Sequence, residues 1–190
     1  MELSNLLERC CRGDELAWEA LVRRFQARIY GIAYCYTGNP EDARDLAQEA
    51  FIRIYQNLAI CTDETKFLPW IITITRNVCI DHLRRKQTRP PAHDLAADEL
   101  LTLREPGSGP GEQYEAESRK RLVHRALQEM TGLNREILLL KDIQGLALEE
   151  IAAMLNVPVG TVKSRSNRAR IELAQKLAFL RGEPAGGAAV

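Results

Sequence analysis

The stretch from Leu146 to Leu177 most constrains the fold of this chain, because its apolar pattern fits two short helices joined by a tight turn. Asn156 tolerates the left-handed backbone that a sharp turn needs, and Pro158 cannot continue a helix interior. A second helix is expected from about Thr161, with Thr161 or Gly160 as its cap. In the first helix, apolar residues recur at helical spacing: Leu148, Ile151, Ala152 and Leu155.

The second expected helix is strongly basic. Between residues 163 and 181, six basic residues face a single acid, Glu172: Lys163, Arg165, Arg168, Arg170, Lys176 and Arg181. Such a local excess suits contact with phosphate. Together with a small residue at Ala152, a turn at Asn156 and an apolar wedge at Val162, it predicts a DNA-reading helix-turn-helix. A plain helical hairpin with a solvated basic face is the alternative interpretation.

Helical periodicity recurs along the whole chain of 190 residues, so an all-α fold is expected. Lys and Arg (26) balance Asp and Glu (26), and only the distribution of charge informs on partners. The five cysteines are odd in number and lack a paired CxxC, which favours buried, reduced thiols. With no apolar run near the roughly 18 residues that span a bilayer and no signal-peptide pattern, a soluble cytoplasmic protein is expected.

Three helices are expected before residue 59, over 3–11, 15–37 and 40–58. Asn39 and Pro40 form a good start for the third, and Glu41 and Asp42 lie in its first turn, where the helix dipole favours acids. One face of this helix is mainly acidic, with an exposed isoleucine: Asp45, Gln48, Glu49, Ile52 and Arg53. It is either a solvated face or a docking surface for a basic protein partner.

A loop is expected over 59–66, followed by a helix over 67–89 that ends in a basic run. Trp70 is most simply a core residue. An aromatic side chain beside a cationic helix also suits single-stranded nucleic acid, which needs stacking surfaces and a positive track. The pattern leaves both interpretations open. The helix also carries the polar residues Thr73, Thr75 and Asn77.

Composition changes after Pro90-Pro91. Residues 91–116 are acidic and contain a Pro/Gly run, which predicts a flexible linker between two small helical domains, 1–90 and 117–181. Helices over 118–130 and 134–143 are expected to pack on the helix-turn-helix. The tail, 182–190, is too poor in large apolar residues to fold.

Two helical domains, a short linker and a C-terminal helix-turn-helix resemble the extracytoplasmic-function (ECF) class of bacterial RNA polymerase sigma factors. Residues 41–57 are similar to the helix with which that family binds core polymerase, and residues 135–165 are similar to its fourth conserved region. Residues 67–85 resemble its promoter-melting helix, with family residues at Phe67, Trp70, Ile74, Asn77, Asp81 and Arg84.

The resemblance implies three contact sets and two macromolecular partners, core RNA polymerase and promoter DNA. Polymerase binding falls to Asp45, Gln48, Glu49 and Arg53. Binding of the minus-ten element falls to Lys66, Trp70, Thr73, Arg76, Asn77 and Arg84. Reading of the minus-thirty-five element falls to Thr161, Lys163, Ser164, Arg165, Arg168 and Arg170. The first residues of that helix would meet base edges and the later ones mostly phosphate.

The resemblance also implies a linker that runs through the RNA-exit region of polymerase, and an anti-sigma factor, often membrane-anchored, as inhibitor. The chain departs from the family at several positions. Ala147 replaces a serine that would complete a capping box with Glu150. Ser166 stands where a larger apolar residue is usual, and Asn167 at a varied position. Further departures are Thr73 for arginine, Thr75 for alanine and Thr131 for proline.

A stand-alone helix-turn-helix regulator is the competing hypothesis, although it needs neither the acidic helix nor the Trp70 helix. An enzyme is not expected, because the three histidines do not cluster and no glycine-rich phosphate loop is present. Cys79 and His82 form only an isolated pair. No cofactor, metal or small-molecule substrate is therefore expected.

Overall fold

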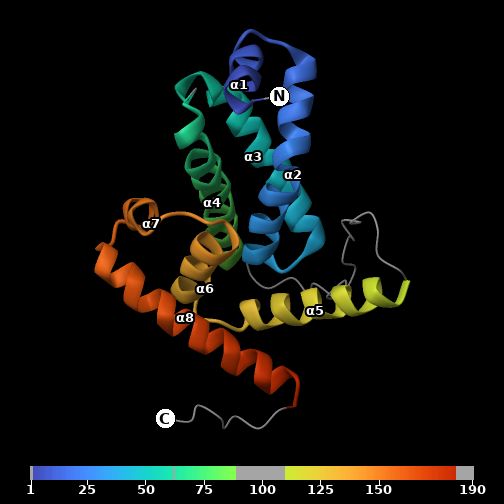
Figure 1. Cartoon of the computed structure of the whole chain (residues 1–190), viewed down its shortest axis with the longest axis vertical. Helices are drawn as coiled ribbons and strands as arrows, with labels where there is room; N and C mark the ends of the chain where they lie inside the picture. The colour runs from blue at the N-terminus through green and yellow to red at the C-terminus, as the bar shows by residue number, and fades with distance from the viewer. Residues whose placement is uncertain (1, 62, 89–109, 183–190) are drawn as a thin grey trace. The chain divides into compact units, whose positions relative to one another are not determined.

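The computed structural model describes residues 2–61, 63–88 and 110–182, which fall into two compact units, 1–99 and 100–190 (Figure 1). Within the described ranges the chain is helical and contains no strand, which confirms the all-α prediction. Most of the expected linker, 91–109, and the tail beyond residue 182 lie outside the described residues. No helix in the described ranges is long and apolar enough to cross a membrane.

The first unit is built around α2 (Glu15–Thr37), which packs against α1 (Leu3–Cys11), α3 (Pro40–Asn57) and α4 (Glu64–Thr88). Asp14 caps α2 by accepting a hydrogen bond from the Ala17 N–H at 3.1 Å, and Gly38 ends it with a left-handed backbone, φ 67°. The bounds expected for the first two helices and the start of the third are therefore confirmed, whereas α3 ends at Asn57, one residue earlier than expected. Their core is aliphatic and aromatic: Leu7, Leu21, Ile29, Ile32, Ile54, Phe67 and Ile71.

The loop expected over 59–66 is shorter than predicted. Leu58–Ile60 form a 3-10 turn, η1, and α4 begins at Glu64 rather than Phe67. The carboxylate of Asp63 explains the early start, because it accepts hydrogen bonds from the Thr65 N–H at 2.9 Å and the Thr65 hydroxyl at 2.6 Å. Pro69 then lies inside α4 near its N-terminal end.

The second unit packs α8 (Val159–Leu180) against α5 (Pro110–Gln128), α6 (Gly132–Leu138) and α7 (Leu148–Leu155). Both helices expected before the helix-turn-helix have different bounds from the prediction. Helix α5 begins inside the range expected as linker and ends at Gln128 rather than 130. The helix expected over 134–143 begins at Gly132 and ends in a π-helical turn, η2 (Leu139–Ile143). The core joins all of these elements: Leu127, Ile137, Leu139, Leu140, Ile151, Val162 and Ala169.

The helix-turn-helix predicted from Ala152, Asn156 and Val162 is present. Asn156 takes the left-handed conformation, φ 53°, and Val162 is fully buried. Helix α8 begins at Val159 rather than Thr161, because the carbonyl of Pro158 already accepts the N–H of Thr161 at 2.9 Å. The prediction that Gly160 or Thr161 caps this helix is therefore wrong.

Candidate nucleic-acid interfaces

The N-terminal half of α8 presents its basic side opposite a buried seam formed by Val162, Ser166 and Ala169. Lys163, Ser164 and Arg168 are exposed, whereas Thr161 and Arg165 are half-buried at the edge of the seam. The Ser164 hydroxyl donates to the Thr161 carbonyl at 3.1 Å. Five of the six residues predicted to read duplex DNA therefore lie at or near the surface of one helix end.

Arg170, the sixth predicted contact, is engaged within the protein. Its guanidinium donates to both carboxylate oxygens of Asp142 in η2, at 3.1 Å from Nε and 2.6 Å from Nη2. This hydrogen bonding lowers the pKa of Asp142 from its ordinary value, although partial burial opposes the shift, and it raises the pKa of Arg170. The side chain of Arg170 therefore connects α8 to η2 within the protein.

Ser166 explains how a polar residue can stand in the seam of α8. Its side chain is fully buried, and its hydroxyl oxygen lies 3.1 Å from the Nζ of Lys141, which donates to it. A buried hydroxyl is tolerated when it is hydrogen-bonded. The apolar residue that the family usually has is therefore replaced here by a polar contact between η2 and α8.

Glu172 joins α8 to the first turn of α6. Its carboxylate accepts the Thr131 N–H at 2.7 Å, the Thr131 hydroxyl at 3.1 Å and the Asn134 amide at 2.6 Å. Burial alone would raise the pKa of Glu172, but these hydrogen bonds lower it. A proline at position 131 would have no N–H to donate to Glu172. The threonine that departs from the family pattern therefore makes this hydrogen bond possible.

On α4, five of the six residues predicted to bind the minus-ten element share one face. Their spacing along the helix aligns them within a narrow stripe, whereas Arg76 lies about a quarter of a turn away. Asn77 is exposed and lies 3.5 Å from an Arg76 guanidinium nitrogen. The stripe runs the length of the helix: Lys66, Trp70, Thr73, Asn77 and Arg84.

Trp70 is half-buried at the edge of this stripe. Its ring lies against Phe67, with centroids 5.8 Å apart, and Phe67 in turn packs on Phe25 at 5.4 Å. Trp70 is therefore anchored from behind while part of it remains accessible. Two threonines are occupied locally: Thr73 donates to the Pro69 carbonyl at 2.8 Å and buried Thr75 to the Ile71 carbonyl at 2.7 Å.

The acidic face of α3 splits into an outward part and an inward part. Asp45 and Gln48 are exposed, whereas Glu49 is half-buried and forms an ion pair with Arg53. Arg53 also approaches Asp81 of α4, with 3.7 Å between Nη1 and Oδ2. The structure therefore separates the four residues predicted to bind polymerase into two that face solvent and two that bridge to α4.

An apolar cleft of about 470 Å³ lies beside the C-terminal half of α3, and the sequence analysis did not predict it. Its walls include Trp18, Phe51, Ile52 and Tyr55, and the Trp18 and Tyr55 rings lie 4.9 Å apart. Ile52 and Tyr55 are more than half exposed. The exposed isoleucine in the acidic face was the sequence signal that could have located this cleft.

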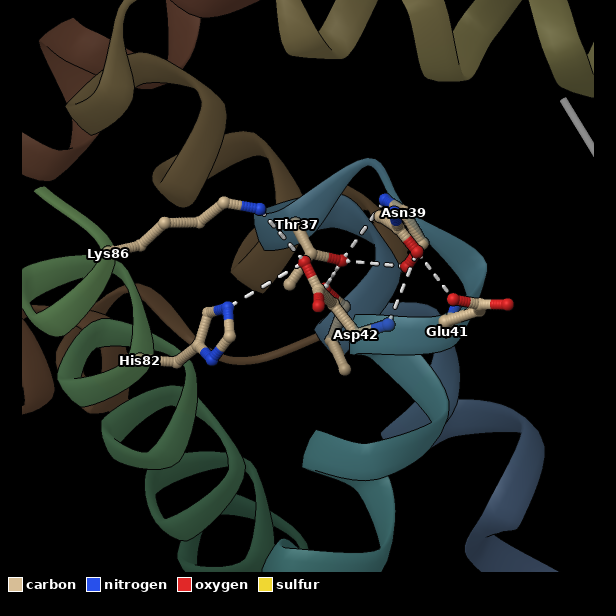
Figure 2. A network of polar contacts seen from close by, with 7 residues as sticks. Thr37, Asn39, Glu41, Asp42, His82 and Lys86 are labelled. Carbon is tan, nitrogen blue, oxygen red and sulfur yellow. Dashed lines mark hydrogen bonds and ion pairs between the residues drawn. The ribbon is translucent and has the colours of Figure 1, made fainter. Parts of the chain in front are cut away.

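The first turn of α3 also contacts α4 through a polar network (Figure 2). Asp42 Oδ2 lies 3.3 Å from the Nζ of Lys86 and 3.7 Å from the Nε2 of His82. His82 therefore faces a carboxylate. The described residues include no group of three or more His, Cys, Asp or Glu side chains able to hold a metal ion.

Two family comparisons cover most of the chain. Residues 21–89 match Sigma-70 region 2, and residues 120–173 match Sigma-70, region 4. The ECF RNA polymerase sigma-E factor of Escherichia coli K12 is 32% identical over 177 residues, which cover 90% of this chain and 92% of that protein. The chain belongs to the ECF class of sigma factors. Such a protein binds core RNA polymerase and directs promoter-specific initiation of transcription.

Other relatives of this sigma factor span nearly its whole length. The RNA polymerase sigma-H factor of Pseudomonas aeruginosa is 34% identical over 173 residues, 87% of this chain and 89% of that protein. The ECF RNA polymerase sigma factor SigW of Bacillus subtilis is 32% identical over 184 residues, 93% of this chain and 97% of that protein. The family named from sequence resemblance is thereby confirmed.

Two solved structures share the fold of this sigma factor. CnrH, in complex with the cytosolic domain of CnrY, has a TM-score of 0.64 at 24% identity, covering 94% of this chain and 97% of that chain. RpoE from Bartonella quintana, in complex with the anti-sigma factor NepR, has a TM-score of 0.66 at 20% identity, covering 85% of this chain and 96% of that chain.

Proposed function

We propose that this sigma factor divides its work among three helices. Helix α3 binds core RNA polymerase through Asp45 and Gln48, α4 binds and opens the minus-ten element, and α8 reads the minus-thirty-five element in duplex DNA. The observation that carries the proposal is the pair of cationic helix faces, one in each unit, each set opposite the core of its own unit.

The exposed start of α8 supports duplex reading. Lys163, Ser164 and Arg168 are exposed at the end of the helix where a helix-turn-helix meets base edges and phosphates. Arg170 makes the smallest contribution to DNA binding within the predicted set, because contact with phosphate would compete with its two hydrogen bonds to Asp142. Its role is to hold the helix in place.

The stripe on α4 supports contact with an opened strand. Trp70 offers a partly accessible ring for stacking, while Lys66, Asn77 and Arg84 offer charge and hydrogen bonds along the same line. Thr73 and Arg76 lie close by, but Thr73 already donates to a backbone carbonyl. This combination distinguishes a sigma factor from a stand-alone regulator, which has no need of a second DNA-binding helix.

Variants in the separate faces test the division of labour. Lys163→Gln is expected to weaken binding of the holoenzyme to promoter DNA several-fold and to reduce the slope of log affinity against log salt by about 1. Affinity for core polymerase should stay unchanged. Arg181→Gln, which removes the same charge from the far end of α8, is the matched control.

Asp45→Arg is expected to give the opposite pattern, with weaker binding to core polymerase and an intact fold by circular dichroism. Asp45 is a better choice than Glu49, because Glu49 holds Arg53 and its loss would disturb the junction with α4. If Asp45→Arg left polymerase affinity unchanged while Lys163→Gln lowered it, the assignment of the faces would be wrong.

We also propose that an anti-sigma factor, anchored in a membrane, restrains this protein in the cytoplasm, and that the protein itself catalyses no reaction. The complexes of CnrH with CnrY and of RpoE with NepR support a partner of this kind. The test is to purify the proteins that bind this chain in its own cells and add each to a transcription reaction. One of them is expected to abolish initiation, and initiation unaffected by all of them would contradict the proposal.

A further inference from the structure

The end of α4 is held to the first unit differently from its beginning. Up to Cys79, the helix is fixed by a fully buried seam that includes Phe67, Ile71, Thr75 and Val78. Beyond Cys79, no side chain of α4 that the structure describes is buried. The last turns, which carry Arg84, therefore need another kind of contact to keep their orientation.

His82 and Lys86 continue the buried seam at helical spacing, on the side of α4 opposite Lys66, Asn77 and Arg84. Both meet the carboxylate of Asp42 in the first turn of α3, at 3.7 Å and 3.3 Å (Figure 2). The Nε2 of His82 is buried and has no hydrogen bond among the described residues, so the Asp42 carboxylate is the polar group it faces.

Asp42 is itself firmly placed. The Asn39 side chain accepts the N–H of Glu41 at 2.8 Å and that of Asp42 at 3.2 Å, which fixes the first turn of α3. The Asn39 N–H donates to the Thr37 hydroxyl at 3.3 Å, which ties this turn to the end of α2. The dipole of α3 also favours a negative charge at this position.

We propose that Asp42 is a positioning residue for promoter binding: through Lys86 and His82 it sets the orientation of the last turns of α4 and so keeps Arg84 in line with Asn77 and Trp70. The inference rests on the proposed role of α4 at the minus-ten element. In this view Lys86 faces the protein rather than DNA. Its positive charge serves to anchor the helix.

The first test compares Asp42→Asn with Glu41→Gln in holoenzyme bound to the promoter fragment on which the unaltered protein initiates. Both variants remove one negative charge from the same turn, but the exposed Glu41 forms no ion pair with the part of α4 whose side chains the structure describes. Asp42→Asn is expected to weaken promoter binding about five-fold, as the loss of the partly exposed ion pair with Lys86 and of the polar contact with His82 would do. Glu41→Gln should leave promoter binding unchanged.

The salt dependence separates positioning from a general loss of folded protein. When Arg84 is no longer presented to phosphate, the slope of log affinity against log salt should fall by about 1. A smaller active fraction would leave this slope unchanged. If Asp42→Asn instead tightened promoter binding and steepened the slope, Asp42 would act by neutralising Lys86, and the proposal would be overturned.

A double variant tests whether Asp42 and Lys86 act together. Lys86→Met keeps the aliphatic stem and removes the charge, and its effect should resemble that of Asp42→Asn without adding to it in the double variant. Additive losses would show that Lys86 contacts DNA independently and would overturn the proposal. If Asp42→Asn does not fold, the promoter affinity of Lys86→Met is measured instead. Asp42→Glu, which keeps the carboxylate, should then bind the promoter as the unaltered protein does.

Arg84→Gln distinguishes the proposed role of α4 in promoter binding from the proposed positioning role of Asp42. If Arg84→Gln leaves promoter affinity unchanged, the proposed role of α4 fails together with this inference. If Arg84→Gln weakens promoter binding and Asp42→Asn does not, only the positioning role of Asp42 fails. Affinity for core polymerase is measured for every variant and is expected to match that of the unaltered protein.

Discussion

Single polar side chains decide how α8 is held in the second unit. Glu172 accepts hydrogen bonds from the start of α6, whereas Ser166 and Arg170 both bond to η2, so together the three side chains tie α8 to two other elements. None of these bonds was predicted from sequence, because each partner is distant along the chain and periodicity reports only which face a residue occupies. Ser166 was recognised only as a departure from the family.

Glu172→Gln is expected to lower the free energy of unfolding of the second unit by about 1–2 kcal/mol, since it weakens three hydrogen bonds to a carboxylate. The measurement is urea denaturation followed by circular dichroism. Glu149→Gln, an exposed acid on α7, is the control and should change stability little. Equal effects from the two variants would show that Glu172 does not cap α6.

Asp142 gives the second unit a component of acid sensitivity. Its pKa is lowered in the fold by Arg170, so the ion pair stabilises the unit above the ordinary carboxyl pKa of 3.8 and is lost as pH falls through the lowered value. Asp142→Asn should therefore lower the free energy of unfolding at pH 7 by up to about 1 kcal/mol, which is measured as a slightly lower melting temperature. The difference from the unaltered protein should shrink toward pH 3, and a difference that grows instead would contradict the role.

The cysteines follow the sequence prediction with one exception. Four are buried, but Cys11 is exposed. Burial, with smaller contributions from Cys35 and Glu49, raises the pKa of Cys79 to about 12, which leaves almost no reactive thiolate near neutral pH. Alkylation of the native protein at pH 8, read by mass spectrometry, should modify Cys11 first and Cys79 only on unfolding. Equal rates at the two residues would contradict the burial of Cys79.

At the scale of elements, helix starts were predictable where the cap is local. Asp14 and Asn39 accept backbone N–H groups two or three residues on, and the expected starts of α2 and α3 are confirmed. The start of α8 was predicted two residues too late, because its N-cap residue is Pro158, whose side chain accepts no capping hydrogen bond. The π-helical turn η2 follows no hydrophobic period, and its role appears only from the contacts of Lys141 and Asp142 with α8.

The start of α7 is weaker than it could be. The carboxylate of Glu150 accepts the Ala147 N–H at 2.8 Å, but Ala147 has no hydroxyl to accept a bond in return. Ala147→Ser would complete the capping box and should stabilise the second unit by about 0.5–1 kcal/mol in thermal unfolding. Ala153→Ser, on the exposed face of the same helix, should not stabilise it, and equal gains from both variants would contradict the capping argument.

For the whole molecule, the proposed division of labour assigns different parts of one process to the two units. The first unit carries the acidic face of α3, proposed to bind polymerase, and the stripe on α4, proposed to bind the minus-ten element. The second unit carries α8, the proposed recognition helix. Resemblance to a family located these faces from sequence, because exposed charge and aromatic residues are readable in the chain. It did not separate outward Asp45 and Gln48 from inward Glu49 and Arg53, since that separation depends on the contact with Asp81.

The most direct test of this division is to map the 5′ ends of transcripts made by core polymerase with this sigma factor on total genomic DNA. The start sites are expected to follow two short shared sequence elements at a constant spacing, and Lys163→Gln should reduce initiation from them without loss of polymerase binding. Start sites without a shared upstream pair of elements, or equal initiation by core polymerase alone, would contradict the account.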